Sequence, residues 1–278
     1  MAMVVTVAPS AQAAPANPSL AQVHDFAFGL GLNANDPAVL ASLEQYDLVV
    51  IDGELTKPAT VARLRAAGVV VLGYLSVGTI EPFRSWYRKL KPYALGDRFK
   101  QFGETYADVA ARGFRREIAR RIAPRLLRKG FDGLFLDNTD MVETHKSERT
   151  GMRRLVRSLS DLVHGRGGLL FAQNGDSSVG ALLRFYDGWN REDVTWTYSF
   201  KRRRYVHQSA AEVAQAQGAL RRIGALGLLV TATDYTRRGE NAATQESIAN
   251  ACTAGALPFV SDIGLTRLPA APLSCGSP

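Results

Sequence analysis

The sequence predicts a (β/α)8 barrel, an α/β fold that forms a single domain. Short apolar runs alternate with amphipathic stretches eight times along the chain, which is the order expected of a parallel sheet covered by helices. The apolar runs are continuous rather than alternating, as in strands that are buried on both faces. Eight such units in about 250 residues match the usual size of this barrel.

Each predicted strand is an apolar run, and each predicted helix shows apolar residues at a spacing of three or four. The strands are expected at 26–32, 47–54, 69–78, 131–138, 168–175, 186–190, 226–235 and 256–264. The helices that follow them are expected at 36–46, 57–68, 116–130, 147–167, 177–185, 209–225 and 241–255.

An open doubly wound sheet is the main rival fold. It would carry a glycine-rich phosphate loop of the form G-x-G-x-x-G after its first strand. The chain has "GLGLNANDP" there, which lacks that spacing. We find no internal repeat and no second domain, so the barrel is expected to span residues 21–278.

Residues 1–20 are predicted to be a signal peptide followed by an Ala/Pro-rich linker. A short apolar run precedes Ala11-Gln12-Ala13, an A-x-A cleavage pattern that is typical of a secreted protein. No Lys or Arg stands before the run, and a disordered tail is the alternative. In a secreted protein, the only two cysteines, Cys252 and Cys275, are expected to form a disulfide worth roughly 3 kcal/mol. Two unpaired thiols are the other possibility.

The chain is basic, with a net charge of +8 and a pI near 9.7. Its Arg and Lys residues gather in "RGFRREIARRIAPRLLRKG", "RTGMRRLVRS" and "FKRRRY". Helical spacing of these residues favours solvated helix faces, and no nucleic-acid motif accompanies them. The chain lacks HExxH and CxxC patterns, so we expect no metal site and no cofactor. No later segment is long and apolar enough for a membrane span.

Carboxylates, amides and tyrosines follow the predicted strands, where a barrel places its active face. Asp132 and Asp187 lie at strand starts and are expected to be turn or capping residues, while Asp176 and Asp262 are expected to be N-caps of the next helix. Asp137 directly ends the apolar "GLFL" run, so its burial calls for a partner or a function. The residues at the strand ends are Asp52, Glu54, Tyr74, Ser76, Glu81, Asp137, Asn138, Asp140, Gln173, Asn174, Asp176, Asn190, Glu192, Asp234, Tyr235, Ser261 and Asp262.

Two carboxylates facing each other across the barrel mouth suit glycoside hydrolysis. One acid protonates the leaving oxygen, and the other attacks the sugar or activates water. Tyr74, Trp189 and Tyr235 could stack on sugar rings or serve packing alone.

At these residues the sequence resembles glycoside hydrolase family 114, the endo-α-1,4-polygalactosaminidase-like proteins. The resemblance covers residues 24–268 and is carried by "YDLVVIDGE", "VLGYLSVGTIEPFR", "GFDGLFLDNTD", "AQNG", "YDGWNRED" and "TDY". It implies a secreted barrel that cleaves an α-1,4-linked galactosamine-containing polysaccharide within the chain. It also implies Asp137 as nucleophile and Glu192 as general acid/base. The substrate groove would be lined by Asp52, Tyr74, Glu81, Arg84, Asn138, Asn174, Asp234 and Tyr235.

One position departs from the family pattern. The family commonly has an acid directly after the glycine of "SVG", where this chain has Thr79, and its next acid is Glu81. The subsite that reads the amino group of the sugar could therefore differ. A groove rich in acids nevertheless suits a cationic amino-sugar polymer.

Two other functions remain open at the level of sequence. A carbohydrate-binding barrel without catalysis would use the same aromatic and acidic side chains. A phosphodiesterase barrel could hold Mg²⁺ or Ca²⁺ through Asp52, Glu54 and Asp137. In each case we expect a monomer whose partner is neither nucleic acid nor a membrane.

Overall fold

The computed structural model describes residues 20–276. The predicted leader falls almost wholly within residues 1–19 and so lies outside the described residues. Among the described residues, no helix is both long and apolar enough to cross a membrane.

Eight parallel strands form a barrel-like sheet in the order β1-β2-β3-β7-β8-β9-β12-β13. The first and last strands approach each other: the ring centroids of Phe26 on β1 and Phe259 on β13 lie 5.6 Å apart. The strands match the eight predicted runs. They are β1 (Phe26–Phe28), β2 (Leu48–Asp52), β3 (Val70–Ser76), β7 (Gly133–Asp137), β8 (Leu169–Gln173), β9 (Gly188–Glu192), β12 (Leu229–Tyr235) and β13 (Leu257–Ser261).

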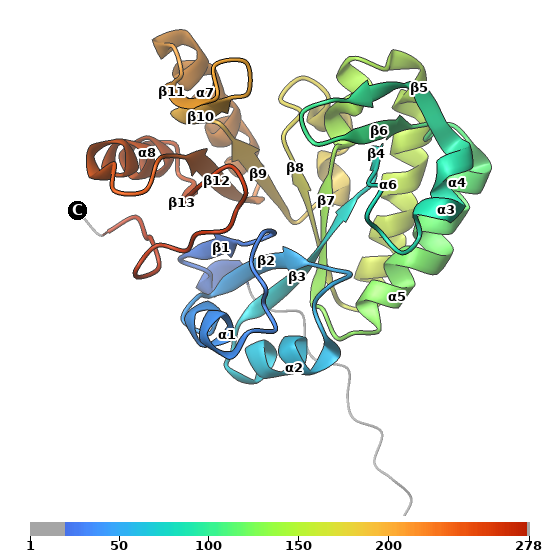
Figure 1. Cartoon of the computed structure of the whole chain (residues 1–278), viewed down its shortest axis with the longest axis horizontal. Coiled ribbons are helices and arrows are strands. Elements are labelled where there is room, and N and C mark those ends of the chain that lie inside the picture. The colour runs from blue at the N-terminus through green and yellow to red at the C-terminus, as the bar shows by residue number, and fades with distance from the viewer. Residues whose placement is uncertain (1–19, 277–278) are drawn as a thin grey trace, which may run out of the picture.

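Helices cover the outside of this sheet (Figure 1). The α-helices are α1 (Pro37–Leu43), α2 (Pro58–Ala66), α3 (Tyr87–Leu90), α4 (Arg112–Glu117), α5 (Ala123–Leu127), α6 (Arg149–His164), α7 (Ala210–Gly224) and α8 (Asn241–Thr253). A π-helix, η3 (Ile118–Ile122), joins α4 to α5. The 3-10 turns are η1 (Leu20–Gln22), η2 (Lys91–Tyr93), η4 (Thr139–Glu143), η5 (Lys146–Glu148), η6 (Val179–Ala181) and η7 (Leu183–Phe185). The helix predicted at 177–185 is therefore wrong, and this short segment forms η6 and η7 instead.

Two small antiparallel sheets extend the loops at the carboxyl ends of the strands. One has the order β4-β6-β5, from β4 (Thr79–Ile80), β5 (Ala94–Phe99) and β6 (Glu104–Ala107). The other is the hairpin of β10 (Trp196–Ser199) and β11 (Arg204–His207). The hairpins β5–β6 and β10–β11 were not expected from the sequence, because their strands are only partly buried and carry no long apolar run.

Large aromatic side chains fill the inside of the barrel. Phe28 packs on Phe135 with ring centroids 5.0 Å apart, and both are 1% exposed. Residues two apart in a strand point to the same face. Asp137, two residues after Phe135, therefore points into the barrel mouth above this aromatic layer. Burial of the layer fixes which strand-end side chains face inward.

The two cysteines are joined, as the sequence suggested. Cys252 on α8 and Cys275 form a disulfide with a Cα–Cα distance of 5.4 Å. This bond holds the C-terminal segment against the last helix. The Cα–Cα distance lies within the normal range for disulfides.

Candidate active site

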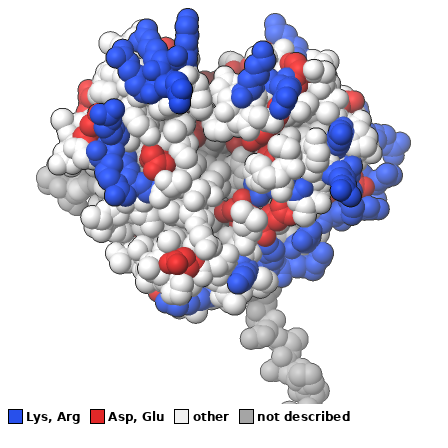
Figure 2. Space-filling model, in the orientation of Figure 1, with Lys and Arg blue, Asp and Glu red and all other residues white. Residues whose placement is uncertain are grey.

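A cavity of about 590 Å³ opens at the carboxyl ends of the strands. Figure 2 shows acidic side chains in the hollow at the centre of this face and basic side chains around it. Arg84 is the single Lys or Arg that lines the cavity among the described residues. The acids that line it are Asp52, Glu81, Glu104, Asp137, Asp140, Glu192 and Asp193.

Asp137, the last residue of β7, accepts hydrogen bonds on both carboxylate oxygens. The Tyr74 hydroxyl donates to Oδ2 at 2.5 Å, and the Asn138 backbone N–H donates to Oδ1 at 2.6 Å. Gln173 Nε2 also donates to Oδ1, at 3.2 Å. Burial raises the pKa of Asp137, and these donors oppose the rise. They favour the ionised form, which a nucleophile requires.

Glu192, the last residue of β9, has a different environment. Gln173 Nε2 and Asn174 Nδ2 donate to Oε2 at 2.7 and 2.8 Å, and the Tyr235 hydroxyl donates to Oε1. Burial, followed by the nearby charges of Asp193 and Asp137, raises the pKa of Glu192 to about 8. Glu192 is therefore mostly protonated at neutral pH, as a general acid should be.

Gln173 fixes the distance between the two acids. Its Nε2 lies 3.2 Å from Asp137 Oδ1 and 2.7 Å from Glu192 Oε2, so these oxygens are separated by at most the two distances combined, about 5.9 Å. Carboxyl groups of retaining glycosidases lie ≈ 5–5.5 Å apart, and those of inverting enzymes ≈ 6.5–9.5 Å apart. This upper limit lies below the spacing of inverting enzymes.

The residue after each of β7, β8 and β9 adopts a left-handed backbone conformation. Asn138, Asn174 and Asp193 have φ of 58°, 56° and 57°. This region is uncommon for non-glycine residues and is enriched in Asn and Asp. The bend lets the backbone N–H of Asn138 reach the carboxylate of Asp137. The side-chain amide of Asn138 donates to Asp137, and that of Asn174 donates to Glu192. Backbone strain of this kind is typical of functional sites.

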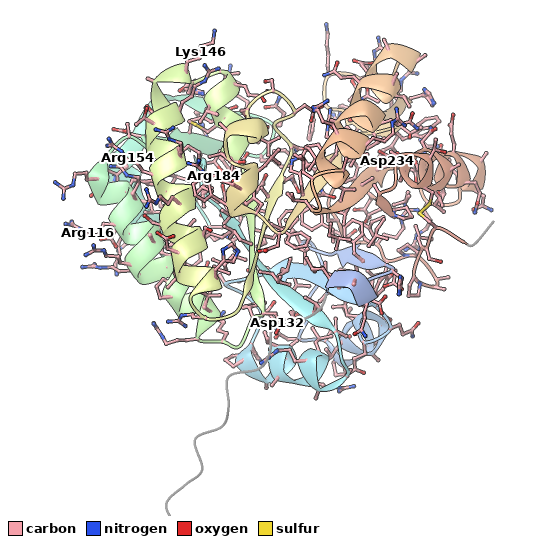
Figure 3. The ribbon with its side chains drawn as sticks, turned by 180° about the vertical axis from the view of Figure 1, so that it is seen from behind. Arg116, Asp132, Lys146, Arg154, Arg184 and Asp234 are labelled. Atoms are coloured by element: carbon pink, nitrogen blue, oxygen red, sulfur yellow. A yellow bond between two sulfur atoms is a disulfide. The ribbon has the colours of Figure 1, made fainter. Side chains whose placement is uncertain are left out.

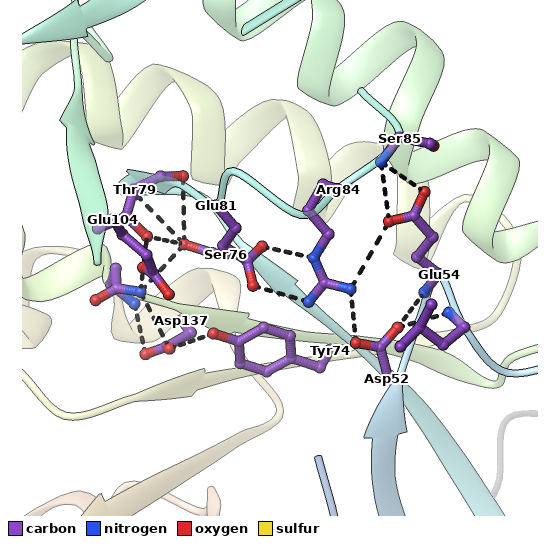
Figure 4. A network of polar contacts seen from close by, with 12 residues as sticks. Asp52, Glu54, Tyr74, Ser76, Thr79, Glu81, Arg84, Ser85, Glu104 and Asp137 are labelled. Atoms are coloured by element: carbon purple, nitrogen blue, oxygen red, sulfur yellow. Dashed lines mark hydrogen bonds and ion pairs between the residues drawn. The ribbon is translucent and has the colours of Figure 1, made fainter. Parts of the chain in front are cut away.

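Arg84 is held by carboxylates of its own (Figure 4). It forms two hydrogen bonds of 2.8 Å to Glu81 and one of 2.6 Å to Asp52, and it is only 5% exposed. Asp52 uses its other oxygen to accept the N–H groups of Glu54 and Leu55. The positive charge of Arg84 is thus matched within this network, and the rest of the cavity stays acidic.

A second chain of hydrogen bonds connects Glu104 on β6 to Asp137. Thr79 Oγ1 donates to Glu104 Oε2 at 2.6 Å and lies 2.6 Å from Ser76 Oγ. Asn138 Nδ2 donates to Ser76 Oγ at 3.1 Å and to Asp137 Oδ2 at 3.1 Å. Burial, then the charges of Glu81 and Asp137, raises the pKa of Glu104 to about 7. Glu104 thereby supplies a carboxyl group beside Thr79, which occupies the position after the "SVG" glycine where the family pattern has an acid.

Gly78, the glycine of "SVG", packs against the loop after β7. A Cβ atom at this position would lie 1.8 Å from the carbonyl oxygen of Asn138. Only glycine allows the two backbones to approach so closely. The motif therefore has a packing role that positions Thr79 and Asn138 next to each other.

Two further acids at the cavity have raised pKa values. Burial, then the charge of Asp137, raises the pKa of Asp140 to about 7. Burial also raises the pKa of Asp193 to about 6. The cavity thus concentrates carboxyl groups that titrate near neutral pH, a feature of functional sites.

Aromatic side chains form the rim of the cavity. Phe83, Phe102 and Phe200 are 66%, 50% and 40% exposed. Phe102, in the β5–β6 turn, packs on Phe200, at the tip of the β10–β11 hairpin, with ring centroids 5.4 Å apart. Trp189, one of the three aromatic residues considered for sugar stacking, is fully buried and donates to the Asn174 carbonyl. It serves packing.

The structure brings nine of the ten predicted site residues to this cavity. Asp234 is the correction, since it does not line the cavity. Its carboxylate accepts the backbone N–H groups of Val194 and Thr195 at 2.7 and 3.0 Å. The physical reason is strand alternation: Tyr235 faces the barrel mouth, so the preceding residue faces outward.

The remaining predicted acids have structural partners. Asp132 and Asp187 accept backbone N–H groups of Val71 and Leu170 at strand starts, as expected of capping residues. Asp262 accepts the N–H of Thr266 in the turn after β13. Asp176 forms an ion pair with Arg191 at 2.8 Å instead of capping a helix.

Several cavity residues were not expected to have a role from the sequence. Gln173 stood among the strand-end residues but received no role, although it bridges both acids. Asp140 and Asp193 had the same signal, a polar residue after a buried strand. Glu104 and the rim residues Phe102 and Phe200 come from the unpredicted hairpins, so no strand-end signal could identify them.

Within residues 20–276, no group of three or more His, Cys, Asp or Glu side chains is arranged to hold a metal ion. In particular, Asp52 is engaged by Arg84, and Glu54 accepts the backbone N–H of Ser85 at 3.1 Å. This arrangement does not suit the metal set of the phosphodiesterase alternative, which paired these two acids with Asp137.

The model of glycoside-hydrolase family GH114 matches residues 6–268 of the chain. No curated protein matches the chain.

Three solved structures share the fold. The glycoside hydrolase domain of PelA from Pseudomonas aeruginosa is 24% identical, with a TM-score of 0.77, over 90% of this chain and 98% of that one. Ega3 of Aspergillus fumigatus, solved in complex with galactosamine, is 17% identical, with a TM-score of 0.70, over 94% and 97%. An α-galactosidase from Thermus thermophilus is 13% identical, with a TM-score of 0.61, over 89% and 59%.

Proposed function

The chain belongs to glycoside-hydrolase family GH114, and on this premise we propose that it cleaves an α-1,4-linked galactosamine-containing polysaccharide within the chain. Asp137 is the nucleophile and Glu192 the general acid/base. The observation that carries the proposal is the pair of acids held by Gln173 Nε2 at 3.2 and 2.7 Å. Their spacing supports retention of configuration.

The reaction proceeds in two steps. Ionised Asp137 attacks the anomeric carbon, and Glu192 gives its proton to the departing glycosidic oxygen. Glu192, now a carboxylate, then takes a proton from the water that releases the sugar from Asp137. Neither acid forms an ion pair with Arg84 or Arg191, which pair with Glu81 and Asp176. This freedom favours catalysis over a binding function alone.

The acidity of the cavity supports an amino-sugar substrate. Seven carboxyl groups and one guanidinium group line the cavity. Glu192 is mostly protonated at neutral pH, but the ionised carboxylates still outnumber the single cation Arg84. A sugar with a free amino group is cationic at this pH. Opposite charges in a partly buried cavity attract strongly, because the effective dielectric constant is low there. The likeness to Ega3, which was solved with galactosamine, agrees with this substrate class.

Secretion is part of the proposal. The A-x-A pattern before residue 14 and the Cys252–Cys275 disulfide both agree with an exported protein, since disulfides persist in oxidising compartments. We also propose that residues 21–278 act as one domain and as a monomer.

Product analysis tests the proposal directly. Purified protein is incubated with partly deacetylated α-1,4-galactosaminogalactan, alongside Asp137→Asn and Glu192→Gln. We expect the unmodified protein to release oligosaccharides, and each variant to be slower by at least roughly 10³-fold. NMR of the first product reports whether the α-configuration is retained. Polymer binding without release would instead favour the carbohydrate-binding alternative, and inverted products would exclude the two-step mechanism.

A further inference from the structure

Two ladders of exposed arginines run along neighbouring helices on the outside of the barrel. Arg112, Arg116 and Arg120 follow one another at four-residue intervals along α4 and η3. Arg149, Arg153 and Arg157 repeat the same interval along α6. Four residues correspond to about 6 Å along a helix. The ladder on α6 is therefore a row of arginines at regular spacing, and the first ladder keeps this spacing within α4 before it enters the π-helix η3.

The two ladders form one surface, called here the arginine face. Arg154 of α6 and Arg112 of α4 are close enough to Arg115 for their charges to lower its pKa, after burial. Figure 3 shows Arg116 and Arg154 projecting from the same side of the molecule. Further exposed arginines nearby are Arg121 on η3, Arg125 on α5 and Arg128, which directly follows α5.

Few acids balance this charge. Between residues 112 and 128 and between 149 and 166, the single exposed acid is Asp161, because Glu117 is buried. Glu117 forms an ion pair with Arg121 at 3.4 Å, and His164 at the end of α6 contacts Asp187 at 2.8 Å; among the described residues, no acid pairs with an arginine of either ladder. Like charges four residues apart destabilise a helix by about 0.2–0.5 kcal/mol per pair. The ladders thus oppose helix stability, and a role in folding does not explain them.

The apolar side chains of the surface argue against a membrane or a stacked base as the partner. The exposed large hydrophobic residues of the described chain lie elsewhere, and they are Leu55, Phe83, Phe102, Phe200 and Leu226. Membrane-bound helices use such residues to enter the lipid, and single-stranded nucleic acids stack on aromatic rings. The arginine face offers neither, but its guanidinium groups bind phosphate and carboxylate oxygens in pairs.

We propose that the arginine face binds a linear polyanion, a flexible chain of repeated phosphate or carboxylate groups. Rows of exposed arginines with few exposed acids among them are complementary in charge to such a chain, and this complementarity supports the proposal. It goes beyond the solvated helix faces favoured by the sequence. It is also independent of the proposed hydrolysis, because the arginine face lies on the helical layer and not at the cavity.

The proposal is tested by binding of end-labelled inorganic polyphosphate to the full chain. Binding is measured by fluorescence anisotropy at NaCl concentrations from ~50 to ~200 mM. We expect binding that weakens as salt rises. The triple variants Arg112→Gln/Arg116→Gln/Arg120→Gln and Arg149→Gln/Arg153→Gln/Arg157→Gln should each bind at least tenfold more weakly. Each should also flatten the salt dependence by a slope of about 2–3.

The matched control removes three exposed arginines elsewhere, in Arg221→Gln/Arg222→Gln/Arg238→Gln, and should bind within twofold of the unmodified protein. Equal weakening in this control would show an effect of net charge alone and overturn the proposal. So would an absence of binding at ~150 mM NaCl, or tighter binding to anionic lipid vesicles than to polyphosphate. Thermal unfolding should show that both ladder variants fold with an unchanged or slightly higher Tm, since repulsion is removed.

Discussion

Each of the two central acids accepts a hydrogen bond from a buried tyrosine hydroxyl. Tyr74 donates to Asp137, and Tyr235 donates to Glu192. A hydroxyl that donates to a carboxylate stabilises the charged form, so both tyrosines lower the pKa of their partner. In the proposed mechanism, ionisation of Asp137 sets the acidic limb of the pH–rate profile, and ionisation of Glu192 sets the alkaline limb.

Replacing either tyrosine by phenylalanine should therefore move one limb of the pH–rate profile, and the two variants should move opposite limbs. Tyr235→Phe removes a donor to Glu192, so the pKa of Glu192 rises and the alkaline limb moves up from about 8. Tyr74→Phe raises the pKa of Asp137 and moves the acidic limb upward. We expect each shift to be roughly half a pH unit to one unit, measured as kcat/KM against pH. Movement of the same limb in both variants would contradict the assignment of the two roles.

We predict that Glu104 contacts the positive charge of the proposed amino-sugar substrate. It is 8% exposed and lines the cavity. Oε2 accepts from Thr79, and no described residue donates to Oε1. Glu104→Gln keeps the hydrogen bond from Thr79 and removes the charge. We expect kcat/KM to fall about tenfold for the free-amine polymer and to stay within twofold for the fully acetylated polymer.

The matched control for this prediction is Thr79→Val, which removes the hydrogen bond but keeps the charge of Glu104. It should preserve the preference for the free-amine polymer. An equal loss on both polymers in Glu104→Gln would mean that Glu104 only supports the structure through Thr79.

At the scale of elements, two hairpins carry the rim of the cavity. The β5–β6 turn bears Phe102 and the β10–β11 hairpin bears Phe200, and their rings are in contact across the mouth. Aromatic faces at this place can stack on the rings of a bound polysaccharide. Because the hairpins are separate from the barrel strands, their loss should affect binding more than chemistry.

Phe102→Ala and Phe200→Ala should raise KM for the polymer by roughly three- to tenfold and leave kcat within twofold, which corresponds to a loss of ~0.5–1.5 kcal/mol of binding. Leu226→Ala is the control, because Leu226 is 62% exposed and does not line the cavity. Steady-state kinetics on the polymer would measure both parameters. A large fall in kcat with unchanged KM would exclude a role of the rim in binding.

At the scale of the whole molecule, a basic protein surrounds an acidic cavity. The net charge is +8, yet the cavity gathers carboxyl groups whose pKa values burial has raised to about 8 for Glu192 and about 7 for Glu104 and Asp140. At pH values between the ordinary pKa range of Asp and Glu and these raised pKa values, the folded protein therefore holds more protons than the unfolded chain. By linkage, its free energy of unfolding falls as pH rises across that interval.

We expect urea unfolding to show a decrease in stability from about pH 4.5 to about pH 8, with little further loss from these groups above it. The sign follows because a raised carboxyl pKa makes ionisation unfavourable in the folded state. Glu192→Gln should weaken this dependence and raise the stability near pH 8. A stability that increases over the same interval would show that the buried carboxyls are ionised without cost.

Much of the barrel could be predicted from the chain alone, because the signals are local. The apolar runs that form β2, β3, β7 and β8 are short, continuous and bounded by polar residues, so their positions follow from hydrophobic pattern. Asp137 stands out because it ends the apolar run of β7. Glu192 follows the short segment "YDGWN", and its expected role came from the family resemblance. The helix expected at 177–185 failed since its apolar spacing is too brief to outweigh local turns.

The sequence by itself determined the eight strands, the acids at their ends and the cysteines able to pair. The tertiary structure alone decided which neighbouring side chain faces the cavity, so that Tyr235 lines it and Asp234 does not. It also decided that Gln173 bridges the two acids and that Glu104 reaches Thr79 from a distant hairpin. Strand and helix patterns reflect neighbours along the chain, whereas these contacts join residues that approach only when the sheet curves into a barrel.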